Sequence, residues 1–404
     1  MTVWILNPFD NLPHEGFRPQ RYWLMAEAFA RAGCSVKYWT SDFNHTTKRR
    51  REMSVAVDSP GIEMRLVPTP PYERNVSLAR VRSHKAFAER WARLARSEPM
   101  QDGPLAIVVS TPPLSTGVAA VEVARERGAF LVADMMDEWP ETFYRLLPSC
   151  LAWLGPFVFW PQRRSSAKLL RNADFVSGVC ERYREKALAA GAKGYFKAYH
   201  GIELREAEDV RGLSGTRGRL RLVYAGNLGR TYDIPTILAA VRDNADWTLD
   251  VAGMGEQSSL FGADALEGCE GRVVYHGYLD SDALARLLAS CDIGIVPMAP
   301  ESCVGVPYKF GDYSAASLAI VSSLGGESAE LLKRYRAGAA YDAGDAESLA
   351  RAVCSLSGDI DSFRAASRGM AEREFDARRI YDEYAARIVQ KTREVGKTAF
   401  CCHV

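Results

Sequence analysis

The chain has 404 residues, of which 47% are hydrophobic and 25% are charged, and its formal net charge is +1. This composition excludes a disordered or low-complexity chain, and the length suits two domains of roughly 150 to 200 residues each. No run of ~18 apolar residues predicts a membrane-spanning helix, and residues 1–13 lack a basic region with a cleavage site, so we expect a cytoplasmic protein.

The distribution of charge bears on possible binding to a membrane, and the spacing of the cysteines bears on possible metal sites. Residues 1–200 contain 28 Lys and Arg against 20 Asp and Glu, a net +8, whereas residues 201–404 contain 23 against 30, a net −7. A basic half suits an anionic membrane surface at the inner face, but a chance difference between two domains explains it as well. The nine cysteines have no CxxC spacing, so we expect free thiols and no metal site, and the terminal CCHV matches no prenylation motif.

The first elements predict a nucleotide-binding type of fold. A strand at residues 3–6 leads into a loop with Gly16, and a helix at 22–32 and a strand at 35–40 follow, without a GxGxxG motif. The basic run at 48–52 is either a solvated charge cluster or a contact for lipid phosphates. A helix at 78–96 carries six basic residues beside aromatic ones, which fits either a surface-binding helix or an ordinary amphipathic helix packed on the sheet.

Two carboxylates follow the strand that begins near residue 130. Asp134 and Asp137 lie three positions apart in an extended stretch, so they project to opposite faces and one of them can face a site. We choose Asp137, and the alternative is that Asp137 satisfies the backbone of the turn that follows it.

Residues 146–160 are almost wholly apolar, broken by prolines and followed by Arg163, Arg164 and Lys168. This stretch is too short to span a bilayer. Two interpretations stay open: insertion to the depth of the lipid headgroups, where Trp and Arg are favoured, or a buried helix that covers the first sheet.

The second half predicts a ligand site at the ends of its strands. After a polar linker at 204–218, a strand at 220–224 leads into a loop in which Gly226 and Gly229 let the backbone approach a diphosphate. Further on, residues 273–326 predict a βαβαβ unit whose loop, after the strand at 293–296, is unusually long. Open α/β sheets bind ligands at such loops.

This second half resembles the nucleotide-sugar half of GT-B glycosyltransferases, in particular the retaining family 4 enzymes. The resemblance rests on Cys291-Asp292, the apolar strand ending at Pro297, and the acidic residues Glu301 and Asp312. Pro307, Lys309, Asp312 and Tyr313 are similar to a P-x-K-x-x-[DE]-Y variant, and residues 137–141 to a DxWPE motif, both from a subgroup that builds bacterial surface glycans.

The resemblance implies an α/β fold of two Rossmann-like, doubly wound domains that face a cleft. Residues 1–203 are expected to bind the acceptor and residues 204–375 the nucleotide sugar, while a helix in 376–404 returns to the first domain. The implied reaction transfers a sugar from a UDP- or GDP-linked donor to a hydroxyl of a glycan or lipid-linked acceptor with retention of configuration, in cell-surface polysaccharide biosynthesis. No DxD motif lies at a strand end, so neither a metal nor another cofactor is expected, and no nucleic acid partner is expected either.

The resemblance also implies roles for single residues. Asp312 holds the ribose, Glu301 contacts the sugar, and Asp137 and Gly16 lie beside the acceptor. Arg230 and Lys309 neutralise the diphosphate, because Asn227 and Tyr232 stand where many members carry Arg and Lys. The residues expected to line the nucleotide are Gly226, Asn227, Gly229, Gly253, Gly255 and Tyr278.

Two alternatives to a glycosyltransferase stay open at this point. A nucleotide-sugar 2-epimerase shares the fold but needs further carboxylates and histidines. A non-catalytic accessory subunit is suggested by the missing Arg and Lys in the diphosphate loop.

Overall fold

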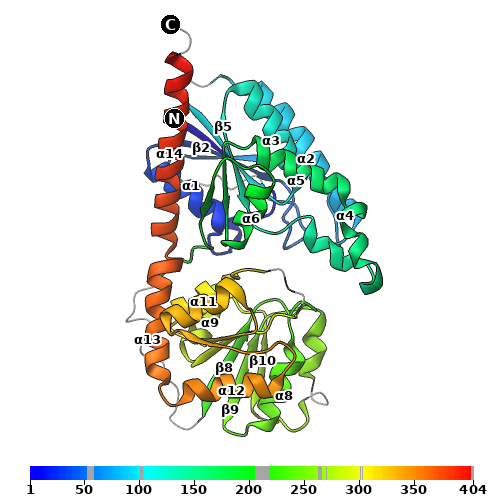
Figure 1. The fold of residues 1–404 in the computed structure, drawn as a ribbon, viewed down its shortest axis with the longest axis vertical. Coiled ribbons are helices and arrows are strands. Elements are labelled where there is room, and N and C mark those ends of the chain that lie inside the picture. The colour runs from blue at the N-terminus through cyan, green and yellow to red at the C-terminus, as the bar shows by residue number, and fades with distance from the viewer. Residues whose placement is uncertain are drawn as a thin grey trace. The chain divides into compact units, whose positions relative to one another are not determined.

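The computed structural model describes residues 1–51, 59–100, 103–204, 219–262, 266–269, 271–300, 302 and 304–401. The chain divides into two compact units, Met1–Ala198 with Arg378–Val404, and Tyr199–Ala377. Each unit has a parallel sheet flanked by helices (Figure 1), which confirms the predicted α/β class with two doubly wound domains. The predicted linker lies, apart from residue 204, outside the described residues.

The first unit contains a seven-stranded sheet in the order β3-β2-β1-β4-β5-β6-β7. Its strands are β1 (Thr2–Leu6), β2 (Ser35–Ser41), β3 (Ile62–Val67), β4 (Leu105–Thr111), β5 (Phe130–Met135), β6 (Phe175–Gly178) and β7 (Tyr195–Lys197). Every residue of β1, β4 and β5 is buried, because strands in the middle of a parallel sheet are covered on both faces. This is why they are predictable as short apolar runs.

Helices cover both faces of this sheet. They are α1 (Arg21–Arg31), α2 (Leu78–Ser97), α3 (Leu114–Arg127), α4 (Gly155–Val158), α5 (Trp160–Asn172), α6 (Arg182–Ala189) and α14 (Ala377–Cys401), with short 3-10 turns η1 (Pro13–Glu15), η2 (Glu141–Leu146) and η3 (Ser149–Leu154). In α2, Phe87 and Trp91 are buried, so this face is that of an ordinary amphipathic helix. The last helix lies within residues 376–404, where the sequence predicts one.

The second unit contains a six-stranded parallel sheet in the order β10-β9-β8-β11-β12-β13. Its strands are β8 (Leu220–Ala225), β9 (Trp247–Ala252), β10 (Val273–Gly277), β11 (Ile293–Val296), β12 (Ala319–Ser322) and β13 (Gly338–Ala340). Its helical elements are α8 (Ile234–Asp243), η4 (Glu256–Phe261), α9 (Ser281–Ala289), α10 (Tyr308–Ala315), α11 (Gly326–Tyr335), α12 (Ala346–Ser357), α13 (Ile360–Met370) and the π-helical turn η6 (Ala371–Phe375). Strand β11 has the predicted bounds.

The basic run at 48–52 is not a solvated cluster throughout, as one interpretation had it. Arg51 is 6% exposed, and its guanidinium pairs with Glu15 at 2.6 Å and donates to the carbonyl of Asp10 at 2.7 Å. The partner carboxylate comes from a loop 36 residues earlier. Arg51 therefore links this run to the loop after β1.

A buried ion pair joins α1 to the middle of the first sheet. Asp134 of β5 accepts hydrogen bonds from Arg21 Nε and Nη2 at 2.8 Å each, from the Tyr22 hydroxyl at 2.7 Å and from Ser177 Oγ at 2.6 Å. Arg21 and Asp134 are both fully buried. Burial disfavours the charged carboxylate, but Arg21 and these hydrogen bonds outweigh it, so the pKa of Asp134 is lowered.

We predict that Asp134→Ala destabilises the first unit strongly, because it leaves the Arg21 guanidinium buried without its anion. The expected loss is about 3–5 kcal/mol, measured by urea unfolding. Asp382→Ala is the matched control, because Asp382 pairs with Arg31 on the surface, and it is expected to cost less than about 1 kcal/mol. Equal losses in the two variants would contradict the prediction.

Candidate functional site

The order of strands in the second unit reverses between β8 and β11. From β8 the chain moves outward to β9 and β10, then returns to the other side of β8 at β11. The loops at 226–233 and 297–307 therefore start side by side at the carboxyl edge, where Asp233 N donates to Pro297 O at 2.8 Å and Ala299 N to Thr231 O at 3.0 Å. Such a reversal is where open α/β sheets bind ligands.

The feature of this edge with the clearest chemistry is a buried lysine. Lys309, in the first turn of α10, is 9% exposed. Its Nζ lies 4.4 Å from the centroid of the Tyr232 ring and 5.2 Å from that of Tyr224, and the two rings meet edge to face. The ammonium group makes no hydrogen bond or ion pair with any residue that the structure describes. Its contacts are therefore of the cation–π kind.

Burial changes the acid–base behaviour of this lysine. Removal from water disfavours the charged form, and the nearby Asp312 offsets this in part, so the pKa of Lys309 is lowered from 10.5 to about 8. At neutral pH the group still carries its charge. An anion that reaches the tyrosine-lined site would meet a cation that pairs with no carboxylate among the described residues.

Two glycines make room for this arrangement. A Cβ on Gly226 would lie 2.3 Å from Lys309 Nζ, and a Cβ on Gly253 would lie 1.8 Å from the carbonyl oxygen of Gly226. Both residues have a positive φ, 140° and 142°, which side-chain-bearing residues rarely adopt. Glycine at these two positions lets the loops after β8 and β9 lie against each other beneath the ammonium group.

The position of α10 is fixed by contacts at several of its residues. The Tyr313 hydroxyl accepts a hydrogen bond from Ala225 N at 2.9 Å and donates to Ile295 O at 3.4 Å, which ties the helix to β8 and β11. Tyr308 stacks on the buried His200 with ring centroids 3.7 Å apart. The helix thereby holds Lys309 in place.

The remaining predicted residues of the second unit lie around this edge with different degrees of exposure. Asp312 is half-buried on α10 one turn after Lys309, and Asn227 and Gly229 belong to the loop after β8. Tyr278, just after β10, is 66% exposed. The Gly255 backbone packs closely on Leu228.

The two other expected charges of this site are placed differently. The Arg230 side chain is 89% exposed and pairs with Glu256 at 2.9 Å. Among the described residues of the two loops and α10, Lys309 is thus the buried cation. Glu301 lies outside the described residues, so the structure says nothing of its predicted role.

In the first unit, Asp137 and Gly16 each stabilise the turn in which they lie. The Asp137 carboxylate accepts hydrogen bonds from Glu138 N at 2.8 Å, Trp139 Nε1 at 3.2 Å and Thr142 Oγ1 at 3.0 Å. This is the geometry of the alternative interpretation, in which Asp137 holds the turn. Gly16 ends η1 with a φ of 80°, as a turn glycine does.

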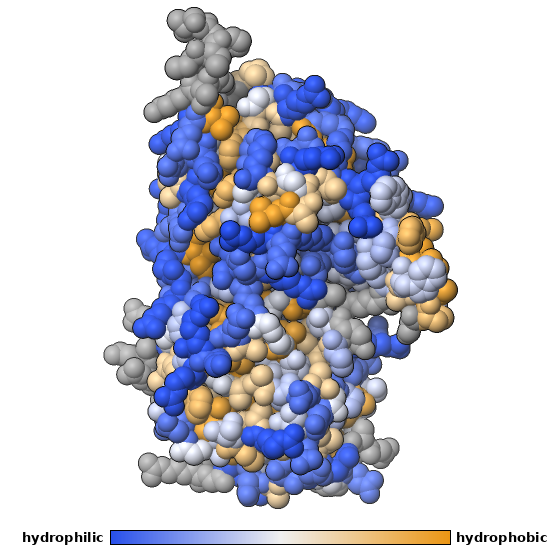
Figure 2. All heavy atoms as spheres, viewed as in Figure 1, coloured by the Kyte–Doolittle hydropathy of each residue, from blue (hydrophilic) through white to orange (hydrophobic). Residues whose placement is uncertain are grey.

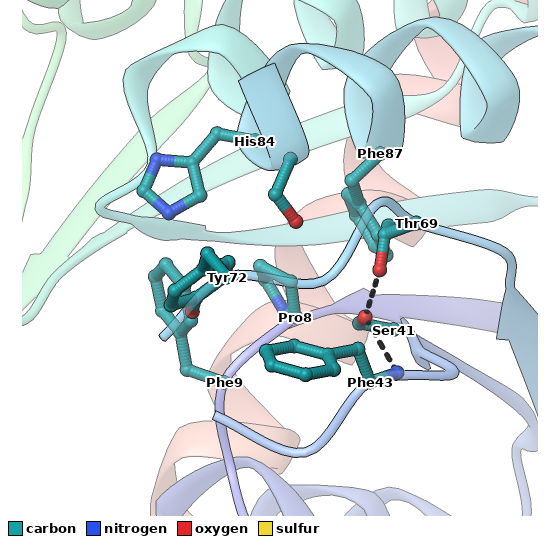
Figure 3. A pocket seen from close by; sticks show the side chains of 9 residues that line it. Pro8, Phe9, Ser41, Phe43, Thr69, Tyr72, His84 and Phe87 are labelled. Carbon is teal, nitrogen blue, oxygen red and sulfur yellow. Dashed lines mark hydrogen bonds between the residues drawn. The ribbon is translucent and has the colours of Figure 1, made fainter. Parts of the chain in front are cut away.

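Sequence analysis missed a pocket at the carboxyl ends of β1, β2 and β3, which Figure 3 shows from close by. The lining is mostly aromatic or hydroxyl-bearing, and consists of Pro8, Phe9, Ser41, Phe43, Thr69, Tyr72, Ser83, His84 and Phe87. Ser41 and Thr69 join their hydroxyls at 2.6 Å. The available signal was that an aromatic residue follows each of these strand ends within five positions.

A cation lies beside this pocket. The Arg80 guanidinium is 5.3 Å from the centroid of the Phe9 ring and 5.7 Å from that of Trp139, and its Nε donates to His84 Nε2 at 3.3 Å. Burial and the neighbouring cations lower the pKa of His84 and of His45 to about 3 each. Both imidazoles are therefore neutral at physiological pH, and the positive charge comes from Arg80 and from Lys48, whose Nζ lies 4.8 Å from the centroid of the Tyr72 ring.

Metal-ligand clusters and membrane-spanning helices are absent from the part of the chain that the structure describes. No three His, Cys, Asp or Glu side chains among them lie together in a way that could hold a metal ion. No helix among them is both long enough and apolar enough to cross a membrane.

Comparison with known proteins adds two family models and a set of solved structures. Residues 219–359 match the model described as "Glycosyl transferases group 1", and residues 19–194 match "Glycosyl transferase 4-like domain". Together these cover most of the chain. No curated protein sequence matches significantly.

Solved structures share the fold over almost the full length. Sucrose-phosphate synthase from Thermosynechococcus elongatus has 16% identity and a TM-score of 0.75, and the match covers 98% of this chain and 99% of that one. HepE from Anabaena, solved with UDP, has 12% identity and a TM-score of 0.67 over 96% and 99%. The lipopolysaccharide outer core galactosyltransferase WaaB has 14% identity and a TM-score of 0.64 over 97% and 100%.

We predict that Lys309→Met stabilises the protein at pH 7 by about 1–3 kcal/mol, because it removes a charge whose burial lowers its pKa from 10.5 to about 8. Below pH 8 both the folded and the unfolded wild type bind this proton, so the full cost is present. Between pH 8 and 10.5 the folded state releases it first, so wild-type stability rises and the advantage of the variant shrinks.

Urea unfolding across this pH range measures the effect. Lys333→Met, at an exposed lysine of α11, is the control and should show no pH-dependent gain. A destabilised Lys309→Met protein at pH 7 would show that the ammonium group is not a burden on the fold.

Proposed function

Since the chain belongs to the GT-B glycosyltransferases of the family 4 type, we propose that it transfers a sugar from a UDP-linked donor to a hydroxyl of a glycan or lipid-linked acceptor, with retention of configuration. The observation that carries the donor half of this proposal is the buried Lys309 ammonium at the reversal of strand order. UDP is preferred over GDP because structures similar in fold were solved with UDP and with UDP-glucose.

The chemical task of the second unit is to stabilise a leaving diphosphate. When the bond between the sugar carbon and the diphosphate oxygen breaks, negative charge grows on that oxygen. A cation fixed in a site of low dielectric stabilises this charge without having to reorganise. Lys309 meets this requirement, since cation–π contacts hold it and no anion among the described residues pairs with it. Gly226 lets the phosphates approach the backbone closely.

The other predicted residues take roles around the diphosphate. Asp312, on the same helix as Lys309, binds the ribose hydroxyls. Gly253, Gly255 and Tyr278, at the ends of β9 and β10, line the side of the base, and Asn227 and Gly229 line the phosphates. Glu301 contacts the sugar. Arg230 joins the diphosphate by leaving Glu256, which is feasible because exposed ion pairs are weak.

The acceptor is assigned to the first unit. The Arg80 guanidinium, which lies over the rings of Phe9 and Trp139 beside the pocket of Figure 3, suits a phosphate of the acceptor. Gly16 and Asp137 are proposed to lie near the acceptor, Asp137 by keeping its turn in place. The DxWPE and PxK motifs support a lipid-diphosphate-linked acceptor in surface polysaccharide assembly, at the cytoplasmic face of the membrane.

Binding of nucleotides tests the donor site. Calorimetry compares UDP, GDP, ADP, dTDP and CMP, each with magnesium and with EDTA, on the wild type, Asp312→Ala and the control Lys333→Ala. We expect selective binding of UDP that does not depend on the metal, is lost in Asp312→Ala and is kept in the control. If none of the nucleotides binds, the proposal is wrong.

We predict that Lys309→Ala lowers kcat by roughly 100-fold or more, the scale of one lost electrostatic contact in the transition state. The measurement is release of UDP in the presence of a lipid-linked acceptor, with circular dichroism to show that the fold is intact. Lys333→Ala should keep full activity. An unimpaired Lys309→Ala enzyme would remove Lys309 from its role.

The affinity for UDP should depend on pH through Lys309. Its pKa is about 8 in the free protein, and a bound diphosphate raises it, so binding above pH 8 requires uptake of a proton. We predict that affinity falls by up to about tenfold per pH unit above 8 and is level just below it. In Lys309→Ala this fall should be absent, and its persistence there would assign it to another group.

A further inference from the structure

An exposed apolar surface lies at one edge of the first unit, in residues 149–160. We call it the apolar tip, and it comprises η3, α4 and the first residue of α5. Its outward side chains are Leu151, Trp153, Phe157, Val158 and Trp160, all at least 42% exposed, with Phe157 at 72%. Figure 2 shows apolar side chains at this edge, at the place that Figure 1 labels α4. These exposures exclude the interpretation that the stretch is a buried cover of the sheet.

The tip is built by side chains that point the other way. Phe159 stacks on Tyr144 with ring centroids 5.9 Å apart and lies 5.8 Å from Phe143, and a Cβ on Gly155 would meet the Tyr144 ring at 2.5 Å. One side of the tip is therefore packed against η2. The apolar side chains on its other side are presented by an ordered scaffold.

The helix that follows anchors the tip to the unit. Leu169 and Leu170 of α5 are buried, and Leu169 packs against Gly117 of α3 so closely that a Cβ there would lie 2.4 Å away. Trp153 and Phe157 are thus exposed on a segment whose neighbouring helix is packed into the unit. A contiguous exposed apolar group on a packed scaffold marks an interaction surface.

The stretch of sequence that contains the tip carries charges of one sign, and Glu141, the acid just before it in η2, is paired with Lys186. Residues 142–173 contain no Asp or Glu, and they contain five Arg and Lys. Arg163, Arg164 and Arg171 are exposed along α5, and Lys168 pairs with Glu122 of α3 at 3.1 Å. The first two lie within one turn of Trp160. A basic flank next to exposed Trp is the pattern found at the boundary between lipid headgroups and acyl chains.

From this juxtaposition we propose that the apolar tip inserts into the interface of a membrane that contains anionic lipids. Trp153, Phe157, Val158 and Trp160 enter to headgroup depth, while Arg163 and Arg164 contact lipid phosphates. The helices of the tip are short, so the protein lies on the bilayer and does not cross it there. This inference rests on the first unit alone and does not require the proposed sugar transfer.

Vesicle binding by the full-length chain tests the proposal. Co-sedimentation compares phosphatidylcholine vesicles with vesicles in which a third of the lipid is phosphatidylglycerol. We expect binding to the anionic vesicles that weakens with salt, and a drop of about tenfold or more in the partition coefficient for the double variant Trp153→Ser, Phe157→Ser. The double variant Arg163→Gln, Arg164→Gln should weaken binding and reduce its dependence on salt.

A matched control separates the tip from apolar exposure in general. Leu188→Ser removes a 48% exposed leucine from α6 of the same unit and should leave vesicle binding unchanged. Quenching of tryptophan fluorescence by lipids with brominated acyl chains should fall when Trp153 and Trp160 are both changed to Phe. Calorimetric binding of UDP is measured on every variant, so a failure of membrane binding is distinguishable from a failure of the donor site.

Three outcomes would overturn the proposal. The wild type fails to bind anionic vesicles, or the tip variants bind as well as the wild type. In the third, the wild type sediments as a dimer that the Trp153→Ser, Phe157→Ser variant loses, which would assign the tip to a second copy of the chain.

Discussion

The buried ammonium group of Lys309 is the constraint around which the second unit's site is arranged. A cation that loses its water is costly unless its surroundings compensate. The faces of Tyr224 and Tyr232 compensate in part, and the lowered pKa records what remains uncompensated. The close glycine contacts at 226 and 253 then follow, because any side chain there would displace either the ammonium group or the neighbouring loop. A group that burdens the fold and is still so firmly positioned is better explained by a ligand than by stability.

The same edge of the sheet draws its charge from an unusual part of the chain. In the pattern that the sequence resembles, an Arg and a Lys in the loop after the first strand face the diphosphate. Here that loop carries Tyr232 and the exposed Arg230, and the buried cation comes from α10, after β11. This arrangement is possible because the two loops start next to each other at the reversal of strand order, and Tyr232 contacts Lys309. Family-level roles therefore transfer to positions in space more safely than to positions in the sequence.

The parts of the structure that sequence predicts well are those with a strong local pattern. Strand β11 is a short apolar run between Asp292 and Pro297, and its bounds were predicted without error because central parallel strands are buried on both faces. Arg51 looked like part of a solvated run because its partner Glu15 is distant in sequence.

The candidate sites show the same division. Lys309 was predicted from its motif, but the two tyrosine rings that contact its ammonium group were not. Tyr224 lies in the strand β8, where a tyrosine is typical of an ordinary core residue. The pocket of the first unit is lined by side chains from α2 and from the loops after three strands. No single segment of the sequence therefore predicts it. The apolar tip left two interpretations open, since a run of apolar residues broken by prolines has no polar face to show which side is buried. Only packing distinguishes Phe159, which stacks inward, from Phe157, which faces solvent.

Charge can act at long range, through the net charge of a domain, or at contact, through a single buried group. The two halves of the chain differ in which of these effects they favour. The excess of cations in residues 1–200 acts over about a Debye length and favours the approach of the first half to an anionic surface. The second half is acidic, yet it is the one proposed to bind an anionic nucleotide. A distributed field could not hold a diphosphate there, whereas one cation kept from water attracts strongly at contact, where screening is weak. Burying Lys309 would thus let an acidic domain bind the proposed anion.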